Sequence, residues 1–188
     1  MTSALLPLLM VTAAVEPPAF QLSTLKGATV QYSDLKGAKA TVLAFMGIKC
    51  PISQAYQARM SRLFADYTAK GVAFVFVDAN ANESAGEIEV YATQARLPFP
   101  VYKDYNNRAA DLLGAQTTPE MFLLDPAGEV RYHGAIDDAT NEARVKTRGL
   151  RDALDAVLAG KEPKVKELKA FGCVLHRAKR AGPTRTDN

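Results

Sequence analysis

The chain has 188 residues, of which 48% are hydrophobic, and its 23 Lys and Arg residues against 20 Asp and Glu residues give a formal net charge of +3. This length is sufficient for one well-buried domain, and the lack of internal repeats and long low-complexity stretches excludes a repeat protein or a low-complexity chain. The positive charge is concentrated at the C-terminal end, because residues 161–188 carry eight Lys and Arg and three Asp and Glu.

The first 16 residues are typical of a targeting segment. Ala4–Val15 form a 12-residue apolar run that is too short to span a bilayer as a stable helix, and the small residues Val11–Ala14 suit a signal-peptidase site. Lys and Arg are absent before the run and Pro7 interrupts it, which suits a plain flexible segment instead. We therefore expect no stable membrane span and a periplasmic or secreted protein, with a cytoplasmic protein as the alternative.

Cys50 lies where a strand is expected to end and a helix to begin. The apolar run Thr41–Met46 is typical of a buried strand of a parallel sheet, and the spacing of apolar residues from Ser53 to about Ala69 predicts a helix. Free backbone N–H groups and the positive end of the helix dipole favour a thiolate at this position, and Lys49 adds a neighbouring positive charge. Cys50 is therefore a candidate nucleophile, and a small buried hydrophobe is the alternative role for a lone cysteine.

The rest of the chain alternates strands and helices, which indicates an α/β fold. A Thr118-Pro119 step leads into the apolar strand Met121–Leu124, and the turn residues 125–128 separate it from a second strand around 129–132, which predicts a hairpin. The other predicted elements are a strand at 72–77, a helix near 85–95, a short strand near 99–102, a helix near 108–113 and a final helix at about 144–158.

Residues 161–188 form a basic C-terminal tail that carries Cys173, the second of two cysteines. Basic tails can bind nucleic acid or anionic membranes, but this one has few aromatic residues and no amphipathic repeat beyond Val165–Leu168. We expect a solvated, partly disordered tail that binds no nucleic acid, with residues 181–188 disordered.

The chain resembles the thioredoxin-like superfamily through Cys50-Pro51-Ile52-Ser53 at the start of a helix and Thr118-Pro119 before a core strand. The order of elements and the opening Pro17–Leu22 resemble the alkyl hydroperoxide reductase/thiol-specific antioxidant, or redoxin, branch. The resemblance implies a domain over residues 17–160 with a thioredoxin-like fold, in which helices flank both faces of a central mixed β-sheet. It also implies a cis Thr118-Pro119 bond packed against Cys50 and a Thr118 backbone that pairs with a bound peptide.

Two features depart from the patterns of this superfamily. Ser53 stands in place of the second cysteine of its Cys-x-x-Cys motif, so the Ser53 hydroxyl is expected either to hydrogen-bond the Cys50 thiolate or to cap the helix. Peroxiredoxins carry Pro-x-x-x-Thr/Ser-x-x-Cys, but here Leu43 and Gly47 occupy the first two of these positions. Disulfide exchange is therefore preferred over peroxidase chemistry.

Cys173 is the sole internal candidate for the thiol that resolves a mixed disulfide at Cys50, because Ser53 can form no disulfide. A bridge would require the two Cα atoms to lie within roughly 7 Å of each other. An incidental tail cysteine and a permanent structural staple are the alternatives. Cys173-x-x-His176 has a spacing that a zinc site could use, but one Cys–His pair supplies too few ligands, so we expect no metal and no cofactor.

The resulting hypothesis is a thiol-disulfide oxidoreductase that acts on protein thiols or disulfides and is served by a thiol reductant. Its candidate catalytic residues are Cys50 and Cys173, and its candidate substrate-binding residues are Pro51, Ser53, Thr118 and Pro119. A redoxin-type thiol peroxidase is the first alternative, with Arg131 or Arg96 in place of a peroxide-binding arginine. A non-catalytic thioredoxin-like binding module is the second.

Overall fold

The structure, a computed structural model, describes residues 18–179. The expected targeting segment at residues 1–16 and the expected disorder of residues 181–188 lie outside the described residues. Within the described part of the chain, no helix combines the length and the apolar character needed to cross a membrane.

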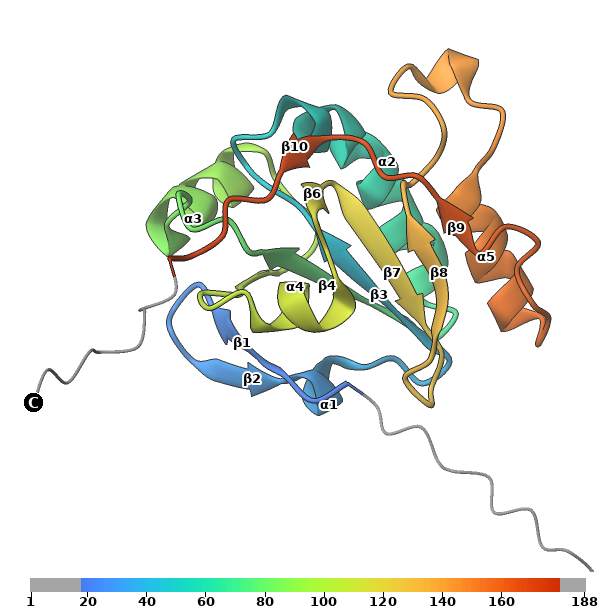
Figure 1. Cartoon of the computed structure of the whole chain (residues 1–188), viewed down its shortest axis with the longest axis horizontal. Helices are drawn as coiled ribbons and strands as arrows, with labels where there is room; N and C mark the ends of the chain where they lie inside the picture. Colours follow the sequence, from blue (N-terminus) through green and yellow to red (C-terminus); the bar gives the residue numbers. More distant parts are fainter. Residues whose placement is uncertain (1–17, 180–188) are drawn as a thin grey trace, which may run out of the picture.

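A mixed sheet in the strand order β2-β1-β5-β4-β3-β7-β8-β9 forms the core (Figure 1). Strands β3, β4 and β5 are parallel, whereas β7 runs antiparallel to β3, and β8 runs antiparallel to β7. A separate short sheet pairs β6 with β10. The strands are β1 (Gln21–Thr24), β2 (Thr29–Gln31), β3 (Ala40–Phe45), β4 (Val72–Asp78), β5 (Val101–Lys103), β6 (Thr117–Thr118), β7 (Glu120–Leu124), β8 (Val130–Gly134), β9 (Glu167–Leu168) and β10 (Cys173–Val174).

Helices cover both faces of the sheet, which confirms the predicted fold class. Successive side chains of β3 alternate between the faces, so Val42 joins the apolar cluster beneath α2 and α5, whereas Leu43 joins the cluster beneath α4. Every residue of β3 is buried, which is the reason for its uninterrupted apolar sequence. The helices are α1 (Tyr32–Leu35), α2 (Pro51–Thr68), α3 (Ala85–Gln94), α4 (Arg108–Leu113), α5 (Gly149–Leu158) and the 3-10 turn η1 (Glu142–Arg144).

The predicted hairpin is confirmed, but the final helix begins later than the sequence predicts. Strands β7 and β8 pair antiparallel, with Met121 opposite Gly134. The pattern predicts a helix from about residue 144, whereas α5 begins at Gly149. Asp138 accepts hydrogen bonds from the backbone N–H groups of Lys146 and Thr147, at 2.9 and 3.0 Å, and this contact holds the preceding segment in a loop.

Residues 161–179, the described part of the segment after α5, take a defined path along the domain although many of them are exposed, which corrects the expectation of a partly disordered tail for this part. Strand β9 pairs parallel with β8 at the sheet edge, and β10 pairs antiparallel with β6. Leu175 is only 4% exposed, and Arg177 forms an ion pair with Asp111. Both strands are two residues long, so they are too short to produce a periodic pattern in the sequence.

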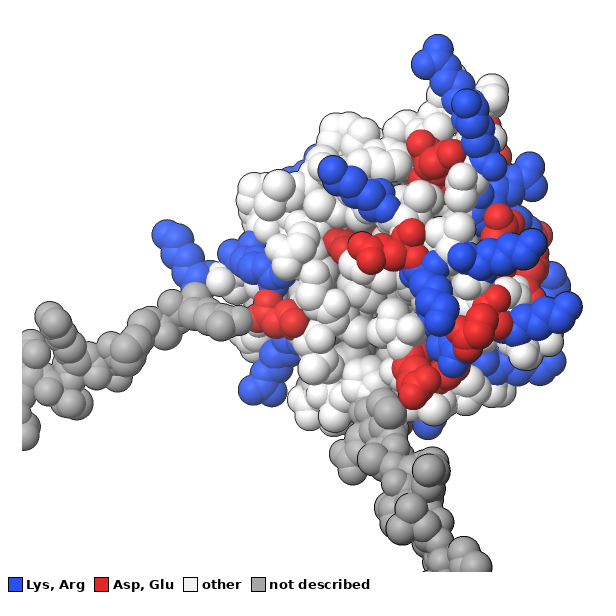
Figure 2. Space-filling model, turned by 45° about the vertical axis from the view of Figure 1, so that its right-hand side comes forward, with Lys and Arg blue, Asp and Glu red and all other residues white. Residues whose placement is uncertain are grey.

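The face that carries α5 and β9 bears charges of both signs. Figure 2 shows Lys and Arg side chains interspersed there with Asp and Glu, and the ion pairs include Arg151–Asp66 at 2.6 Å and Lys166–Glu162 at 2.8 Å. Such mixed charge gives this face no strong field of a single sign.

Candidate active site

Cys50 is the N-cap residue of α2, at the point where the chain has left β3. Its Sγ lies 3.4 Å from the backbone nitrogen of Ser53 and 3.0 Å from the carbonyl oxygen of Thr118. Pro51 occupies the first turn of the helix, where a missing N–H has no effect on helical hydrogen bonding. The helix terminus therefore offers the sulfur a hydrogen-bond donor and the positive end of a dipole.

A disulfide joins Cys50 to Cys173, and the two Cα atoms are 5.8 Å apart. Cys173 reaches this position because β10 pairs with β6, with Cys173 opposite Thr118. Figure 1 shows β10 beside β6 at the end of the sheet. The Thr118-Pro119 bond is cis, as the resemblance implies. The structure thus brings together all six residues that the sequence singled out as candidate site residues, including Pro51 and Ser53.

The Ser53 hydroxyl has a different partner from the two expected from the sequence. It accepts a hydrogen bond from the N–H of Gly47 at 3.3 Å, and the backbone N–H of Ser53 is the group that points at Cys50. Lys49 directs its side-chain nitrogen to the carboxylate of Glu87, at 2.8 Å, rather than to the sulfur. The hydrogen-bond donor to Cys50 Sγ is therefore a backbone N–H group. Any residue type except proline at position 53 would provide it.

A buried carboxylate holds the loop that precedes Cys50. Glu83 is 3% exposed and accepts hydrogen bonds from the backbone N–H groups of Ile48 and Lys49, both at 2.8 Å. Space at Gly47 is tight, because an added Cβ would lie 2.7 Å from the side-chain nitrogen of Asn80, which would have to shift. Glu83 therefore fixes the backbone on one side of Cys50, as the helix terminus does on the other.

Glu83 interacts with a second buried carboxyl group, that of Asp78. Lys103 Nζ donates hydrogen bonds to Asp78 Oδ1 at 2.8 Å and to the Asn80 carbonyl at 2.6 Å. The side chains of Lys103 and Asp78 are both buried. Burial, together with a hydrogen bond to Glu83, raises the pKa of Asp78 to about 8, against the opposing effect of Lys103. The surroundings of Asp78 at the end of β4 therefore favour the neutral form of its carboxyl group.

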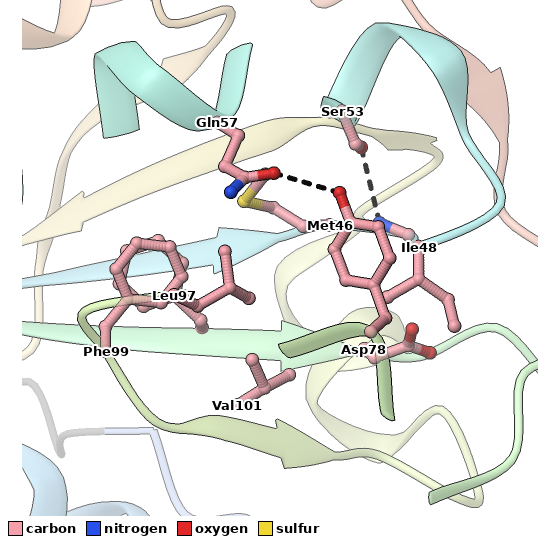
Figure 3. Close-up of a pocket in the computed structure, with 11 residues that line it drawn as sticks. Met46, Ile48, Ser53, Gln57, Asp78, Leu97, Phe99 and Val101 are labelled. Carbon is pink, nitrogen blue, oxygen red and sulfur yellow. Dashed lines mark hydrogen bonds between the residues drawn. The ribbon is translucent and has the colours of Figure 1, made fainter. Parts of the chain in front are cut away.

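A small apolar cavity lies behind this loop, between α2, α3 and the sheet. Its volume is about 30 Å³, and Figure 3 shows Met46, Ile48 and Asp78 among the residues that line it. The Tyr91 hydroxyl donates a hydrogen bond to Gln57 Oε1 at 3.0 Å, which ties α3 to α2 beside the cavity. A cavity of this size has room for a water molecule.

Two further residues of the hairpin have partners outside this site. His133 is half-buried, and its Nε2 lies 2.5 Å from Glu120 Oε1 on β7. Arg131 donates to Asp125 Oδ2 at 3.3 Å, at the end of the hairpin opposite to the one that adjoins Cys50. Arg131 is therefore not placed to bind a peroxide at Cys50.

Glu83, Asp78, Lys103 and Gly172 belong to the surroundings of Cys50 but were not predicted. Asp78 and Lys103 end the neighbouring parallel strands β4 and β5 and pair with each other across them. Charged residues at the carboxyl ends of adjacent parallel strands are the signal that would have identified this pair. Gly172 gives no such signal, because the requirement for glycine comes from Thr118, which is distant in the sequence.

Comparison with known proteins gives two kinds of match in sequence. The model of the AhpC/TSA family matches residues 14–133, a range that includes Cys50 and Thr118-Pro119. The thiol-disulfide oxidoreductase ResA of Bacillus thuringiensis (strain Al Hakam) is 31% identical over 115 residues, which are 61% of this chain and 65% of that protein. The matched region therefore spans slightly less than two thirds of the length of this curated relative.

Solved structures give the same fold. An uncharacterized conserved protein from Geobacillus kaustophilus superposes with a TM-score of 0.80 at 29% identity, over 92% of this chain and 96% of that chain. The pneumococcal exposed lipoprotein thioredoxin of Streptococcus pneumoniae strain TIGR4 gives a TM-score of 0.57 at 18% identity, over 73% of this chain and 98% of that chain. The fold is thus thioredoxin-like.

Proposed function

Because the chain belongs to the AhpC/TSA family, we propose that it is a thiol-disulfide oxidoreductase in which Cys50 is the attacking sulfur and Cys173 the resolving sulfur. The observation that carries the proposal is the bridge between these residues at the N-terminus of α2, beside the Thr118 backbone. A disulfide with a purely structural role does not require a hydrogen-bond donor or a helix dipole at one of its sulfurs. A catalytic thiolate, in contrast, is stabilised by both. The name of the ResA relative states the same reaction class.

The reaction begins with both cysteines reduced. The Cys50 thiolate attacks one sulfur of a partner disulfide, a bond forms between Cys50 and that sulfur, and the other partner sulfur leaves as a thiolate and takes up a proton. The Cys173 thiolate then attacks Cys50 Sγ, and the partner's remaining sulfur leaves as a second thiolate. Two electrons have passed to the partner, and the Cys50–Cys173 bridge is reopened by an external dithiol reductant.

The test is electron transfer to a model peptide that contains an internal disulfide. Reduced protein is mixed with this peptide without other reductant, and products are quantified by thiol counting and mass mapping. We expect the wild-type protein to acquire the Cys50–Cys173 bridge while the peptide becomes a dithiol. Cys173→Ser should stop at a covalent adduct of protein and peptide through Cys50, and Cys50→Ser should form neither product.

Two outcomes would contradict this function. If Cys50→Ser reduces the peptide as fast as the wild type does, Cys50 has no catalytic role and a binding module is favoured. If hydrogen peroxide consumes the Cys50 thiol far faster than the peptide does, a thiol peroxidase is favoured. A parallel reaction with peroxide therefore distinguishes the oxidoreductase, the peroxidase and the binding module in one experiment.

We infer the same partners and location as the sequence suggests: protein disulfides as substrates, in a compartment outside the cytoplasm. The apolar run Ala4–Val15 supports export, and a protein with a closed bridge is suited to an oxidising compartment. Mass measurement of the protein recovered from the periplasmic fraction tests this, because export with cleavage would remove the first residues.

A further inference from the structure

The segment that carries Cys173 lies on the site as an extended peptide would. We call residues Gly172–Leu175 the strap. Its two central residues pair antiparallel with β6, and the Leu175 N–H donates to the Gln116 carbonyl at 2.9 Å. Extended peptides that are recognised by strand addition bind in the same way, through their main chain along a free strand edge. The strap therefore covers the backbone edge beside Cys50.

The position before Cys173 tolerates only glycine. An added Cβ at Gly172 would lie 2.1 Å from the carbonyl oxygen of Thr118 and 3.2 Å from Cδ of Pro119. The nearest of these atoms belongs to backbone that is held in the β6–β10 pairing and cannot turn aside as a flexible side chain would. Any larger residue would push the strap away from β6.

The positions after Cys173 alternate between exposed and buried. Val174 is 75% exposed, whereas Leu175 is 4% exposed and belongs to the apolar cluster that contains Phe45 and Phe122. This alternation is that of a strand with one face on the protein. Along the β6 edge, Cys173 and Leu175 therefore face the protein, and Val174 between them faces solvent.

Contacts other than the bridge hold the strap in place. The His176 N–H donates to Asn80 Oδ1 at 3.0 Å, and the His176 carbonyl accepts from the Ala81 N–H at 2.7 Å. The Ala178 N–H donates to Asn107 Oδ1 at 2.7 Å. Reduction of the bridge removes none of these contacts, so the edge stays covered when Cys50 is a free thiol.

We propose that the β6 edge recognises partner segments with the pattern glycine, cysteine, any residue, apolar residue, and that the strap is the internal template for this pattern. This inference rests on the proposed function. Thr117 and Thr118 can pair with only one segment on this edge at a time, so a partner must displace the strap to reach Cys50. Return of the strap then delivers Cys173 to Cys50 and expels the partner, so that resolution and release are a single event.

The test uses the full chain with Cys173→Ser, which leaves Cys50 as its one thiol. The probes are peptides with the sequence Ala-Phe-Gly-Cys-Val-Leu-His, each carrying thionitrobenzoate on its cysteine as a mixed disulfide. Attack by Cys50 on the peptide sulfur forms a protein–peptide disulfide and releases the coloured thionitrobenzoate thiolate. Variant peptides replace the glycine by valine, the leucine by aspartate, or the valine after cysteine by aspartate.

Adding Gly172→Val to the protein should expel its own strap and raise the rate with the parent peptide by at least about tenfold, the factor that corresponds to the burial of one leucine. Leu175→Asp is a second variant that should act in the same direction. Val165→Asp, at a half-exposed site outside β9 and β10, should change the rate by less than about twofold. In the Gly172→Val protein, the peptides altered at glycine or leucine should react more slowly than the parent, and the one altered at valine should not.

The small disulfide dithiobis(nitrobenzoate) separates failure of this inference from failure of the proposed function. If it reacts normally with Cys50 while all four peptides react at one rate, or while Gly172→Val changes no peptide rate, the template inference is wrong and the oxidoreductase proposal stands. If Cys50 reacts with neither the small disulfide nor any peptide, both proposals fail.

Discussion

Glu83 fixes the backbone before Cys50 with a single carboxylate, and this contact can be tested alone. Glu83→Ala would leave the partly buried N–H groups of Ile48 and Lys49 without their acceptor. We expect the free energy of unfolding to fall by about 1.5–3 kcal/mol, because a hydrogen bond to a charged group contributes about this much. Urea denaturation measures this change. Glu89→Ala, which removes an exposed ion pair with Lys26, is the control and should cost less than about 1 kcal/mol; equal losses in both variants would contradict the assigned role.

Asp78 should make stability depend on pH in the direction set by its raised pKa. Its carboxyl group titrates near 3.8 when unperturbed but near 8 in the folded protein, where burial, a hydrogen bond with Glu83 and the opposing Lys103 act on it. Between these values the folded state binds the extra proton, so the contribution of Asp78 is complete at low pH and is lost as pH rises through about 8. Asp78→Asn should therefore flatten the decline of unfolding free energy across this window. Urea titrations at several pH values measure it, with the exposed Asp66→Asn as control, and equal slopes in wild type and Asp78→Asn would refute the assignment.

At the scale of elements, Asp137 joins α2 to the loop before α5. It accepts hydrogen bonds from the Tyr56 hydroxyl at 2.7 Å and from Arg59 Nη1 at 2.5 Å, and the Arg59–Asp137 pair is buried. Asp137→Ala would leave the Arg59 charge buried without its partner, so we expect unfolding free energy to fall by about 3–5 kcal/mol. Urea denaturation tests this. Glu142→Ala, which breaks the exposed pair with Arg62, should cost no more than about 1 kcal/mol, and a similar cost in both would show that burial is irrelevant.

The parts of the fold that the sequence predicted are those with strong local signals. The apolar run before Cys50 and the Thr118-Pro119 step before β7 are visible within a few residues, and both lie where predicted. The burial of Asp137 could not be predicted in this way, because its partner Arg59 lies on another element and no local pattern links them. The late start of α5 has the same origin, since Asp138 holds the loop through non-helical contacts.

In the candidate site too, the residues with a local sequence signal could be predicted and the others could not. Cys50, Pro51 and Ser53 form a motif that the sequence displays directly, whereas the position of Cys173 depends on a two-residue strand that pairs with β6. The sequence therefore left three roles open for Cys173. Pairing between segments that are distant in the chain decides such questions, and neither propensity nor spacing encodes it.

At the scale of the whole molecule, the bridge links residues 123 positions apart and so constrains most of the chain. A cross-link of this loop length lowers the entropy of the unfolded chain, and the expected stabilisation is about 4–5 kcal/mol. Reduction with dithiothreitol should therefore lower the free energy of unfolding by up to this amount, although the contacts of Leu175 and Ala178 keep the folded state intact. Urea denaturation with and without reductant measures the difference, and Cys173→Ser should unfold identically in both conditions. If wild-type protein that has first been treated with an oxidant is also insensitive to reductant, the bridge does not form in solution, and the resolving role of Cys173 must be abandoned.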